Sequence, residues 1–274
     1  MKKKKDKAEA ERYIAEMRYP VVLAHGIMLK DVKFFKAFGR IEKKLKAHGY
    51  KVYTAKTDGF GTIENNAEQL KAYIEKVKTE ENAEKVNIIA HSKGGLDSKY
   101  MIENLDMADS VASLTTLCTP HKGSPVASFI LRLPRWLVKF VAFWVNLIYR
   151  IFGDKHPDSV TVCRQLSLHS DDELADTSNV SDKVYCQSYS SSIEKSRDDF
   201  IMGIPLLIYR RLSDEKTDGL VSEDSSKFGE YRGSALDETV SHSEIVGFAI
   251  KKKKRARIYE FYLQICKELE QKGF

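Results

Sequence analysis

The sequence has few cysteines and no uninterrupted apolar run long enough to cross a bilayer. Four cysteines lie far apart in 274 residues, with no C-x-x-C pair and no histidine at the spacing of a zinc site. The longest apolar region, residues 136–152, is interrupted by Lys139, Asn146 and Arg150. These absences argue against a disulfide framework, a zinc site and a transmembrane helix.

The first residues also lack the features of a secretory leader. They begin with lysines and continue with charged and small side chains, without an apolar stretch or a cleavage site. We therefore expect a cytoplasmic protein, or a secreted one if a leader has been removed. Residues 1–18 are interpreted as a charged helical extension and residues 19–274 as one domain, because 42% hydrophobic residues suffice for a single buried core.

The net charge of +6 comes from two basic runs rather than from the chain as a whole. Residues 2–5 and 251–255 carry nine positive charges, so the remainder has a small negative excess. Since no base-reading motif accompanies these runs, we expect no nucleic-acid partner. Basic runs of this kind are typical of solvated ends, with contact to anionic lipid or an acidic partner as the alternative.

Over the first half of the chain, apolar runs alternate with segments of helical period. This alternation is typical of βαβ units around a parallel sheet, so the sequence predicts an α/β fold. Strands are expected at residues 20–24, 52–55, 85–90, 111–118 and 183–189, with a further candidate at 205–209. Helices are expected at about 34–47, 67–77, 93–105 and 257–272.

The strongest chemical signal is a serine between a predicted strand and a predicted helix. A nucleophile elbow requires a sharp turn that lifts the serine hydroxyl off the end of the strand. Small residues must flank it two positions away, and Ala90 and Gly94 meet that requirement around Ser92. The alternative is an ordinary strand-to-helix turn in which Ser92 caps the helix.

A nucleophilic serine needs a histidine base and a carboxylate that orients it, both later in the chain for this fold. His242 is the only histidine beyond residue 169, so it is the expected base. Asp218 lies in an Asp-Gly turn and is the preferred acid, with Asp214 and Asp224 as rivals.

The oxyanion of acyl transfer requires backbone N–H donors, normally one after the nucleophile and one after an early strand. Lys93 and Ile27 occupy these positions. His25, Gly26 and His91 are expected to support the site, Gly26 because it lets the backbone approach closely. The side chain of Lys93 either favours anionic substrate groups or points into solvent.

Five motifs, in order, resemble the bacterial triacylglycerol lipases of the Pseudomonas and Burkholderia type. They are residues 21–26, 90–95, 119–124 and 218–221 and the segment around His242, and the resemblance is good over about residues 19–128. It implies an α/β-hydrolase fold, with a mostly parallel central sheet, helices on both faces and a helical lid or cap at about 124–180. It also implies a catalytic triad of Ser92, Asp218 and His242, with the N–H groups of Ile27 and Lys93 as the oxyanion hole.

The chain departs from that pattern at a calcium ligand. Many of the lipases hold one structural calcium partly through an aspartate two residues after the catalytic histidine, where this sequence has Glu244. Asp198 or Asp199 is the available partner acid. We therefore expect no required cofactor and no metal site, with structural calcium as the less favoured alternative.

The insertion at 124–180 offers a broad apolar surface. In a lipase it would lie over the cleft and meet a lipid interface on opening, with Lys139 and Arg150 at headgroup level; the alternative is a permanent cap that shapes an acyl pocket. The residues expected to contact lipid or substrate are Trp136, Phe140, Phe143, Trp144 and Leu147.

Together these features predict a serine carboxylic-ester hydrolase that acts on medium- to long-chain, lipid-like acyl esters. The expected partners are the lipid substrate and, transiently, a membrane or lipid interface. One alternative is an acyltransferase or thioesterase on the same scaffold, which an alcohol or thiol acceptor would reveal. The other is a non-catalytic lipid- or membrane-surface protein, in which Ser92 would not react with a fluorophosphonate.

Overall fold

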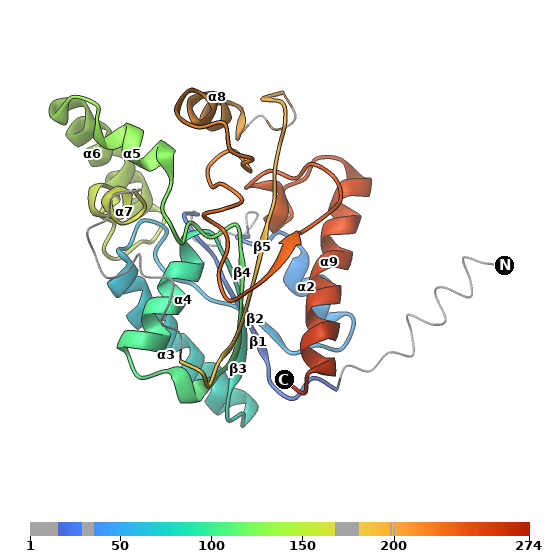
Figure 1. Cartoon of the computed structure of the whole chain (residues 1–274). Helices are drawn as coiled ribbons and strands as arrows, with labels where there is room; N and C mark the ends of the chain where they lie inside the picture. The colour runs from blue at the N-terminus through green and yellow to red at the C-terminus, as the bar shows by residue number, and fades with distance from the viewer. Residues whose placement is uncertain (1–15, 29–35, 168–180, 198, 200) are drawn as a thin grey trace.

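A computed structural model describes residues 16–28, 36–167, 181–197, 199 and 201–274. Within these residues the chain forms a six-stranded sheet in the order β2-β1-β3-β4-β5-β6, and every neighbouring pair is parallel (Figure 1). The strands are β1 (Val21–Ala24), β2 (Val52–Thr54), β3 (Val86–His91), β4 (Val111–Leu117), β5 (Tyr185–Ser190) and β6 (Glu230–Ser234).

Helices cover both faces of the sheet. One face packs against α3 (Ile63–Glu81) and α4 (Lys93–Asn104), and the other packs against α2 (Ile41–Lys46) and α9 (Lys252–Gln271) (Figure 1). All residues of β1, β3 and β4 are buried, which is why these strands are continuous apolar runs in the sequence. The predicted α/β architecture is therefore confirmed.

The helix α3 illustrates how local sequence sets an element. Its buried apolar residues recur at helical spacing, and the Thr62 hydroxyl accepts a hydrogen bond from the N–H of Asn65 at the N-terminus. At the other end Asn82 adopts the left-handed conformation that terminates many helices.

Three expectations about elements were wrong, and one strand was not predicted. Residues 205–209 are not a strand but part of α8 (Gly203–Leu212), whose buried positions follow a helical rather than a strand period. The helix expected at 34–47 is shorter within the described residues, since α2 begins at Ile41. The C-terminal helix begins at Lys252 rather than at residue 257. Edge strand β6 was missed because its sequence is polar.

The region expected to form the lid or cap is helical where the structure describes it. It contains α5 (Pro125–Leu131), α6 (Arg135–Ile151) and α7 (Ser159–Gln165), and residues 168–180 lie outside the described residues. The loop after α6 is tied to the loop after β2. Asp58 accepts hydrogen bonds from the N–H groups of Lys155 and His156, and Asp154 accepts one from the N–H of Phe60.

Two short 3-10 turns complete the described elements. These turns, η1 (Ala108–Ser110) and η3 (Glu244–Val246), precede β4 and α9. All four cysteines are free thiols, as the sequence predicted. Most of the expected N-terminal extension, residues 1–15, lies outside the described residues. Within the described part of the chain, no helix is long and apolar enough to cross a membrane.

Candidate active site

Ser92 lies in a strained turn between β3 and α4. Its backbone has φ 55° and ψ −133°, which a residue with a side chain rarely adopts. The turn brings its N–H to the carbonyl of Leu117 at 3.0 Å and leaves the side chain partly exposed at the carboxyl end of the sheet. This is the geometry of a nucleophile elbow rather than of a capping serine, because the Ser92 side chain makes no capping hydrogen bond to α4.

Close backbone approaches explain the glycines on both sides of this turn. A Cβ on Gly26 would lie 2.7 Å from the Cβ of Ser92 and 3.0 Å from the backbone nitrogen of Lys93. A Cβ on Gly94 would lie 2.6 Å from the carbonyl oxygens of Ala24 and of the next residue. The loop after β1 is therefore pressed directly against the elbow.

A chain of hydrogen bonds connects Ser92 to His242 and Asp218. Nε2 of His242 lies 2.9 Å from the Ser92 hydroxyl, and Nδ1 lies 2.6 Å from Oδ2 of Asp218. The other carboxylate oxygen of Asp218 accepts the N–H groups of Leu220 and Val221 at 2.9 and 2.8 Å. These bonds hold the carboxylate, which is 1% exposed, beside the ring of His242.

The rival acids lie elsewhere. Asp224 is exposed and forms ion pairs with Lys122 and Lys227. Asp214 is exposed after the end of α8. Of the three candidates, the structure brings Asp218 to the histidine.

His25 and His91 are buried on either side of the Ser92 elbow. Nδ1 of His25 lies 2.8 Å from the carbonyl oxygen of Gly26, which holds the ring against the loop after β1. The ring of His91 lies 4.5 Å from that of His242, centroid to centroid. Burial, and then the nearby His242, lower the pKa of His91 well below its ordinary value, so this ring is neutral beside the candidate base.

The side chain of Lys93 contradicts both sequence alternatives. It neither points into solvent nor approaches a substrate group: it is completely buried, and its ammonium lies 2.6 Å from Oδ1 of Asp97, one helical turn later. Asn66 donates a further hydrogen bond to Asp97 at 3.1 Å. Burial lowers the pKa of Lys93 and raises that of Asp97 to about 6, while the pairing opposes both shifts.

The backbone of Lys93 nevertheless lies where the sequence placed it. Lys93 is the first residue of α4. The N–H groups in the first turn of a helix have no acceptor within the helix, so the N–H of Lys93 is available to a ligand. Ile27 directly follows Gly26, which adjoins the elbow, and its side chain packs against the apolar cluster that contains Leu96. Both N–H groups therefore belong to backbone segments that adjoin Ser92.

The carboxylates that would correspond to a calcium site are already engaged. Oε2 of Glu244 lies 2.8 Å from the ammonium of Lys254 and accepts the N–H of Ser241. Asp199 accepts the hydroxyls of Ser241 and Ser243, and the N–H groups of residues 201 and 202. Within the described residues no three acidic, histidine or cysteine side chains are grouped to hold a metal. This donor set does not fit calcium, and Asp198 lies outside the described residues.

Two residues of the site, Asp97 and Lys254, were not predicted from the sequence, and a third was predicted in a different role. Asp97 follows Lys93 at i, i+4 spacing, which is a detectable signal for a pair but says nothing of its burial. Lys254 belongs to the basic run at 251–255, and its pairing with Glu244 depends on the tertiary fold. Asp199 was weighed only as a metal ligand, yet it binds both neighbours of His242.

The lipid-contact candidates lie on α6 with their side chains exposed. Trp136, Phe140, Phe143, Trp144 and Leu147 are between 38% and 70% exposed, and Ala142 is the residue of this helix that is buried. Lys139 and Arg150 lie on the same helix. The expected apolar surface is therefore present, but it faces solvent.

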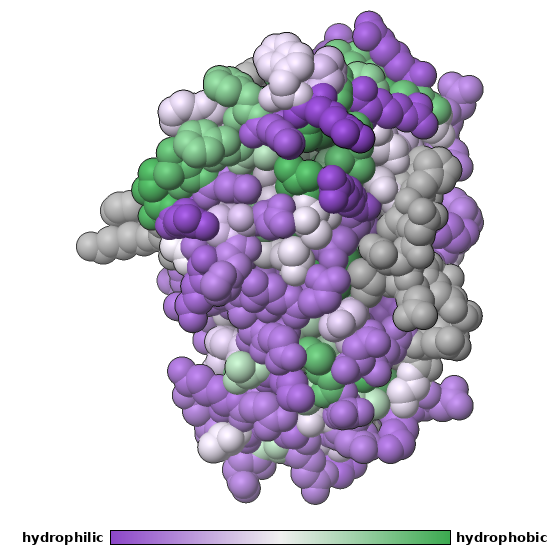
Figure 2. All heavy atoms as spheres, turned by 90° about the vertical axis from the view of Figure 1, so that its left-hand side faces the viewer, coloured by the Kyte–Doolittle hydropathy of each residue, from purple (hydrophilic) through white to green (hydrophobic). Residues whose placement is uncertain are grey.

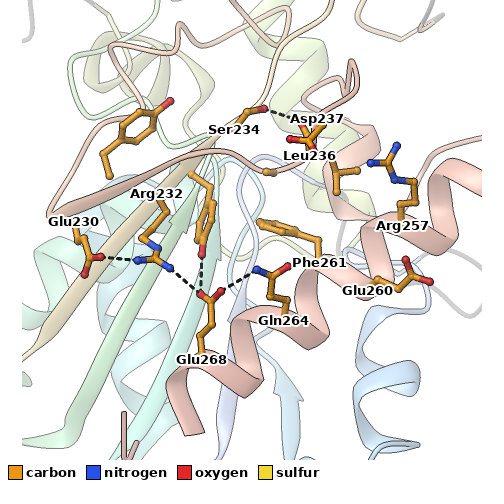
Figure 3. Close-up of a pocket in the computed structure, with 13 residues that line it drawn as sticks. Glu230, Arg232, Ser234, Leu236, Asp237, Arg257, Glu260, Phe261, Gln264 and Glu268 are labelled. Atoms are coloured by element: carbon orange, nitrogen blue, oxygen red, sulfur yellow. Dashed lines mark hydrogen bonds and ion pairs between the residues drawn. The ribbon is translucent and has the colours of Figure 1, made fainter. Parts of the chain in front are cut away.

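A polar hollow lies away from these residues, where β6 meets α9 (Figure 3). Arg232 forms ion pairs with Glu230 and Glu268 across it, and Gln264 donates to Glu268. None of the three residues of the Ser92 hydrogen-bond chain lines this hollow. The side chains of Glu230, Arg232 and Glu268 thus link β6 to α9 at the edge of the sheet.

Comparisons with known proteins match this chain to one family model and to several lipases. A family model described as palmitoyl protein thioesterase matches residues 20–171, more than half of the chain. Triacylglycerol lipase 2 of Saccharomyces cerevisiae is 30% identical over 262 residues, which cover 85% of this chain and 73% of the yeast protein. A triacylglycerol lipase of Burkholderia plantarii is 42% identical over 128 residues, which cover 44% of this chain and 34% of that protein.

Solved structures show the same fold. The crystal structure of Staphylococcus hyicus lipase matches with a TM-score of 0.66 at 16% identity and covers 95% of this chain and 97% of its own. Fold and sequence matches together define an α/β hydrolase of the lipase and esterase class, as the motifs predicted. Within that class the chain belongs to the triacylglycerol lipase family and is a carboxylic-ester hydrolase.

Proposed function

We propose that Ser92, His242 and Asp218 are the catalytic triad of this hydrolase. The observation that carries the proposal is the continuous hydrogen-bonded chain from the Ser92 hydroxyl through His242 to Asp218, with Ser92 in a strained elbow. His242 takes the proton as the hydroxyl attacks the ester carbonyl. Asp218 fixes the ring tautomer and stabilises the imidazolium that forms.

The N–H groups of Ile27 and Lys93 hold the oxyanion of the tetrahedral intermediate. The contact between Gly26 and Ser92 supports this role because it places the loop after β1 beside the nucleophile. Collapse of the intermediate expels the alcohol, which takes the proton from His242, and leaves an acyl-enzyme on Ser92. Water activated by His242 then releases the acid. Catalysis by these residues requires no cofactor.

The substrates we propose are medium- to long-chain acyl esters drawn from a lipid phase. The exposed apolar residues of α6 support this assignment. Exposed apolar patches of this size mark a binding surface, and small polar esters dissolved in water do not require one. Contact with the lipid interface is transient. The bonds of Asp58 and Asp154 support a cap that stays attached at the C-terminal end of α6.

Hydrolysis of p-nitrophenyl esters from acetate to palmitate, below and above substrate aggregation, tests the proposal. Ser92→Ala should lower kcat by about five to six orders of magnitude and abolish labelling by a fluorophosphonate. Asp218→Asn should lower kcat by about 10⁴-fold. The matched control Asp224→Asn changes an exposed carboxylate and should leave kcat within about twofold. Full activity of the Ser92 variant would refute the mechanism.

Cleavage of thioesters is the second candidate function. The match of residues 20–171 to the palmitoyl protein thioesterase model favours it, since this range contains Ser92 and the cap helices. Rates on a palmitoyl thioester and a palmitoyl oxyester should be compared with one enzyme preparation. Added alcohol acceptors in the same assay reveal acyl transfer in competition with water. Family membership argues against the non-catalytic alternative.

A further inference from the structure

The amphipathic helix α6 presents its apolar side chains to solvent. Trp136 is 70% exposed and Phe140 is 59% exposed, and further large apolar residues of this helix are also exposed. Soluble proteins rarely expose a contiguous apolar area of this kind unless it binds something. The additional exposed residues are Val141, Phe143, Trp144, Leu147, Ile148 and Ile151.

A second helix extends this surface. Ile204 and Leu207 of α8 are 70% and 54% exposed, and Ile201 just before the helix is 60% exposed. The helix α5 packs against both α6 and α8, and all three lie at the end of the molecule where the strands terminate (Figure 1). Figure 2 shows apolar side chains gathered at this end with hydrophilic ones among them, above a mostly hydrophilic body.

The charged residues within the helices of this surface are all basic. Residues 125–153 and 201–213 contain six arginines and lysines and no aspartate or glutamate. Because the net charge is +6, the remainder of the chain is neutral overall. Asp154, Asp199 and Asp214 border the two ranges in sequence, and Glu215 lines the same hollow as Arg132. The basic residues are Arg132, Arg135, Lys139, Arg150, Arg210 and Arg211.

We propose that the α6–α8 face, comprising the exposed apolar and basic residues of α5, α6 and α8, docks on an anionic phospholipid bilayer. Apolar side chains enter the headgroup region while basic side chains contact lipid phosphates. A second copy of the chain is a poor occupant, because it would bring six more positive charges against these six. A neutral oil surface offers no anionic group to these exposed basic residues.

The proposal deepens the proposed function, since it names the lipid phase from which the ester would come. Ser92 follows β3 at the same end of the sheet, so the docked face and the site adjoin the same surface. Docking itself uses no catalytic residue. Membrane binding and ester hydrolysis are therefore separable in experiment.

Flotation with vesicles tests the docking, using the full chain with Ser92→Ala so that no lipid is cleaved. Vesicles of phosphatidylcholine alone are compared with vesicles that also contain phosphatidylglycerol. We expect binding to the anionic vesicles that weakens with salt. Arg210→Gln with Arg211→Gln should weaken it about 30-fold, at about 1 kcal/mol per basic residue.

Trp136→Ser with Phe140→Ser should weaken binding more than tenfold on both kinds of vesicle. The control pair, Lys43→Gln with Lys76→Gln, removes two exposed charges from α2 and α3 and should bind as the parent does. Equal binding to neutral vesicles, equal binding by the arginine and control pairs, binding only to neutral oil droplets, or dimerisation through Trp136 and Phe140 would each overturn the proposal.

Turnover of a soluble short-chain ester distinguishes this proposal from the proposed function. The arginine and control pairs, placed in the chain with Ser92 intact, should hydrolyse p-nitrophenyl acetate at the parental rate. Loss of vesicle binding with that rate preserved assigns the α6–α8 face to docking. A parent that binds anionic vesicles but hydrolyses no ester retains the docking and refutes the triad.

A second inference comes from the acids beside His242. Glu244 accepts both the Lys254 ammonium and the Ser241 N–H, and the hydroxyl of Ser241 accepts the N–H of Glu244 at 3.1 Å. Lys254 and Glu244 are about one-tenth exposed, so their charges face little water. The ion pair therefore anchors the turn of residues 241–244 to α9, and this turn contains His242, the proposed base.

We infer that Lys254 is a positioning residue for His242 and supplies the positive charge that a metal supplies in lipases with a calcium site. It neutralises Glu244, which otherwise lies buried close to the Asp199 carboxylate through their shared partner Ser241. Because the ammonium is covalently part of α9, the loop is held without a divalent cation. This inference rests on the proposed role of His242.

Kinetics of Lys254→Met test this inference, with Lys254→Arg for rescue and Lys253→Met as the matched control on an exposed neighbour. We expect Lys254→Met to lower kcat ten- to hundredfold at unchanged KM, because His242 is displaced while the substrate surface is intact. Arginine should restore most of the rate, and a chelator should not affect the parent. Inactivation of the parent by a chelator, or equal loss in Lys253→Met, would overturn the inference.

Discussion

Removing the carboxylate of Asp97 is expected to destabilise the protein by about 3–5 kcal/mol. The Lys93 ammonium lies 2.6 Å from Asp97, and the two side chains are 0% and 2% exposed. Asp97→Ala therefore leaves the Lys93 charge in the interior without its ion-pair partner. For a chain of this size such a loss lowers Tm by about 6–20 °C.

Equilibrium urea unfolding of the parent and the Asp97→Ala variant measures this loss, with Tm from circular dichroism as a second readout. The double variant Lys93→Met with Asp97→Leu removes both charges and should unfold within about 1–2 kcal/mol of the parent, since isolated charges rather than the missing pair carry the penalty. A loss below about 1 kcal/mol in Asp97→Ala, or a double variant as unstable as the single, would refute the reasoning.

Two further changes have defined outcomes. Gly26→Ala places a Cβ 2.7 Å from that of Ser92, so kcat should fall about 10²–10³-fold with modest loss of stability, as ester assays and Tm together report. Burial lowers the pKa of His121 to about 3, so the unfolded chain binds a proton that the folded chain does not between about pH 6.5 and 3. Stability should therefore fall as pH decreases through that range by up to about 1.4 kcal/mol per pH unit. His121→Gln should reduce this slope in urea titrations; an unchanged slope would contradict the assignment.

The sequence predicted best the elements that are completely buried, because every residue in them is selected for burial. Strands β1, β3 and β4 are buried on both faces, so they stand out as continuous apolar runs. The helix α8 was mistaken for a strand because five apolar residues between turns fit both periods. Strand β6 gave no signal because its alternate residues are exposed at the sheet edge.

In the candidate site, too, residues with a local sequence signal were predicted and residues whose role depends on tertiary contacts were not. Ser92 and His242 follow from local context and from a single available histidine, and the preference for Asp218 agrees with the observed contact. The side chain of Lys93 was misjudged, because burial of a charge depends on a partner and on the packing of α3, neither of which the elbow motif contains. The Lys254 contact joins a basic run to a loop only in three dimensions.

Asp199 connects the loop that carries His242 to the start of α8, which belongs to the proposed docking face. Its carboxylate accepts the hydroxyls of Ser241 and Ser243, the residues on either side of His242, and the N–H groups of Ile201 and residue 202 just before α8. Burial alone would raise the pKa of Asp199, but these hydrogen bonds lower it, so the carboxylate is ionised and holds all its donors at neutral pH. A displacement of α8 on a lipid surface would therefore act on the His242 loop through one carboxylate, whereas α6 has its own anchor at Asp58. The carboxylate of Asp199 thus binds both the residues beside the proposed base and the residues that precede the docking helix α8.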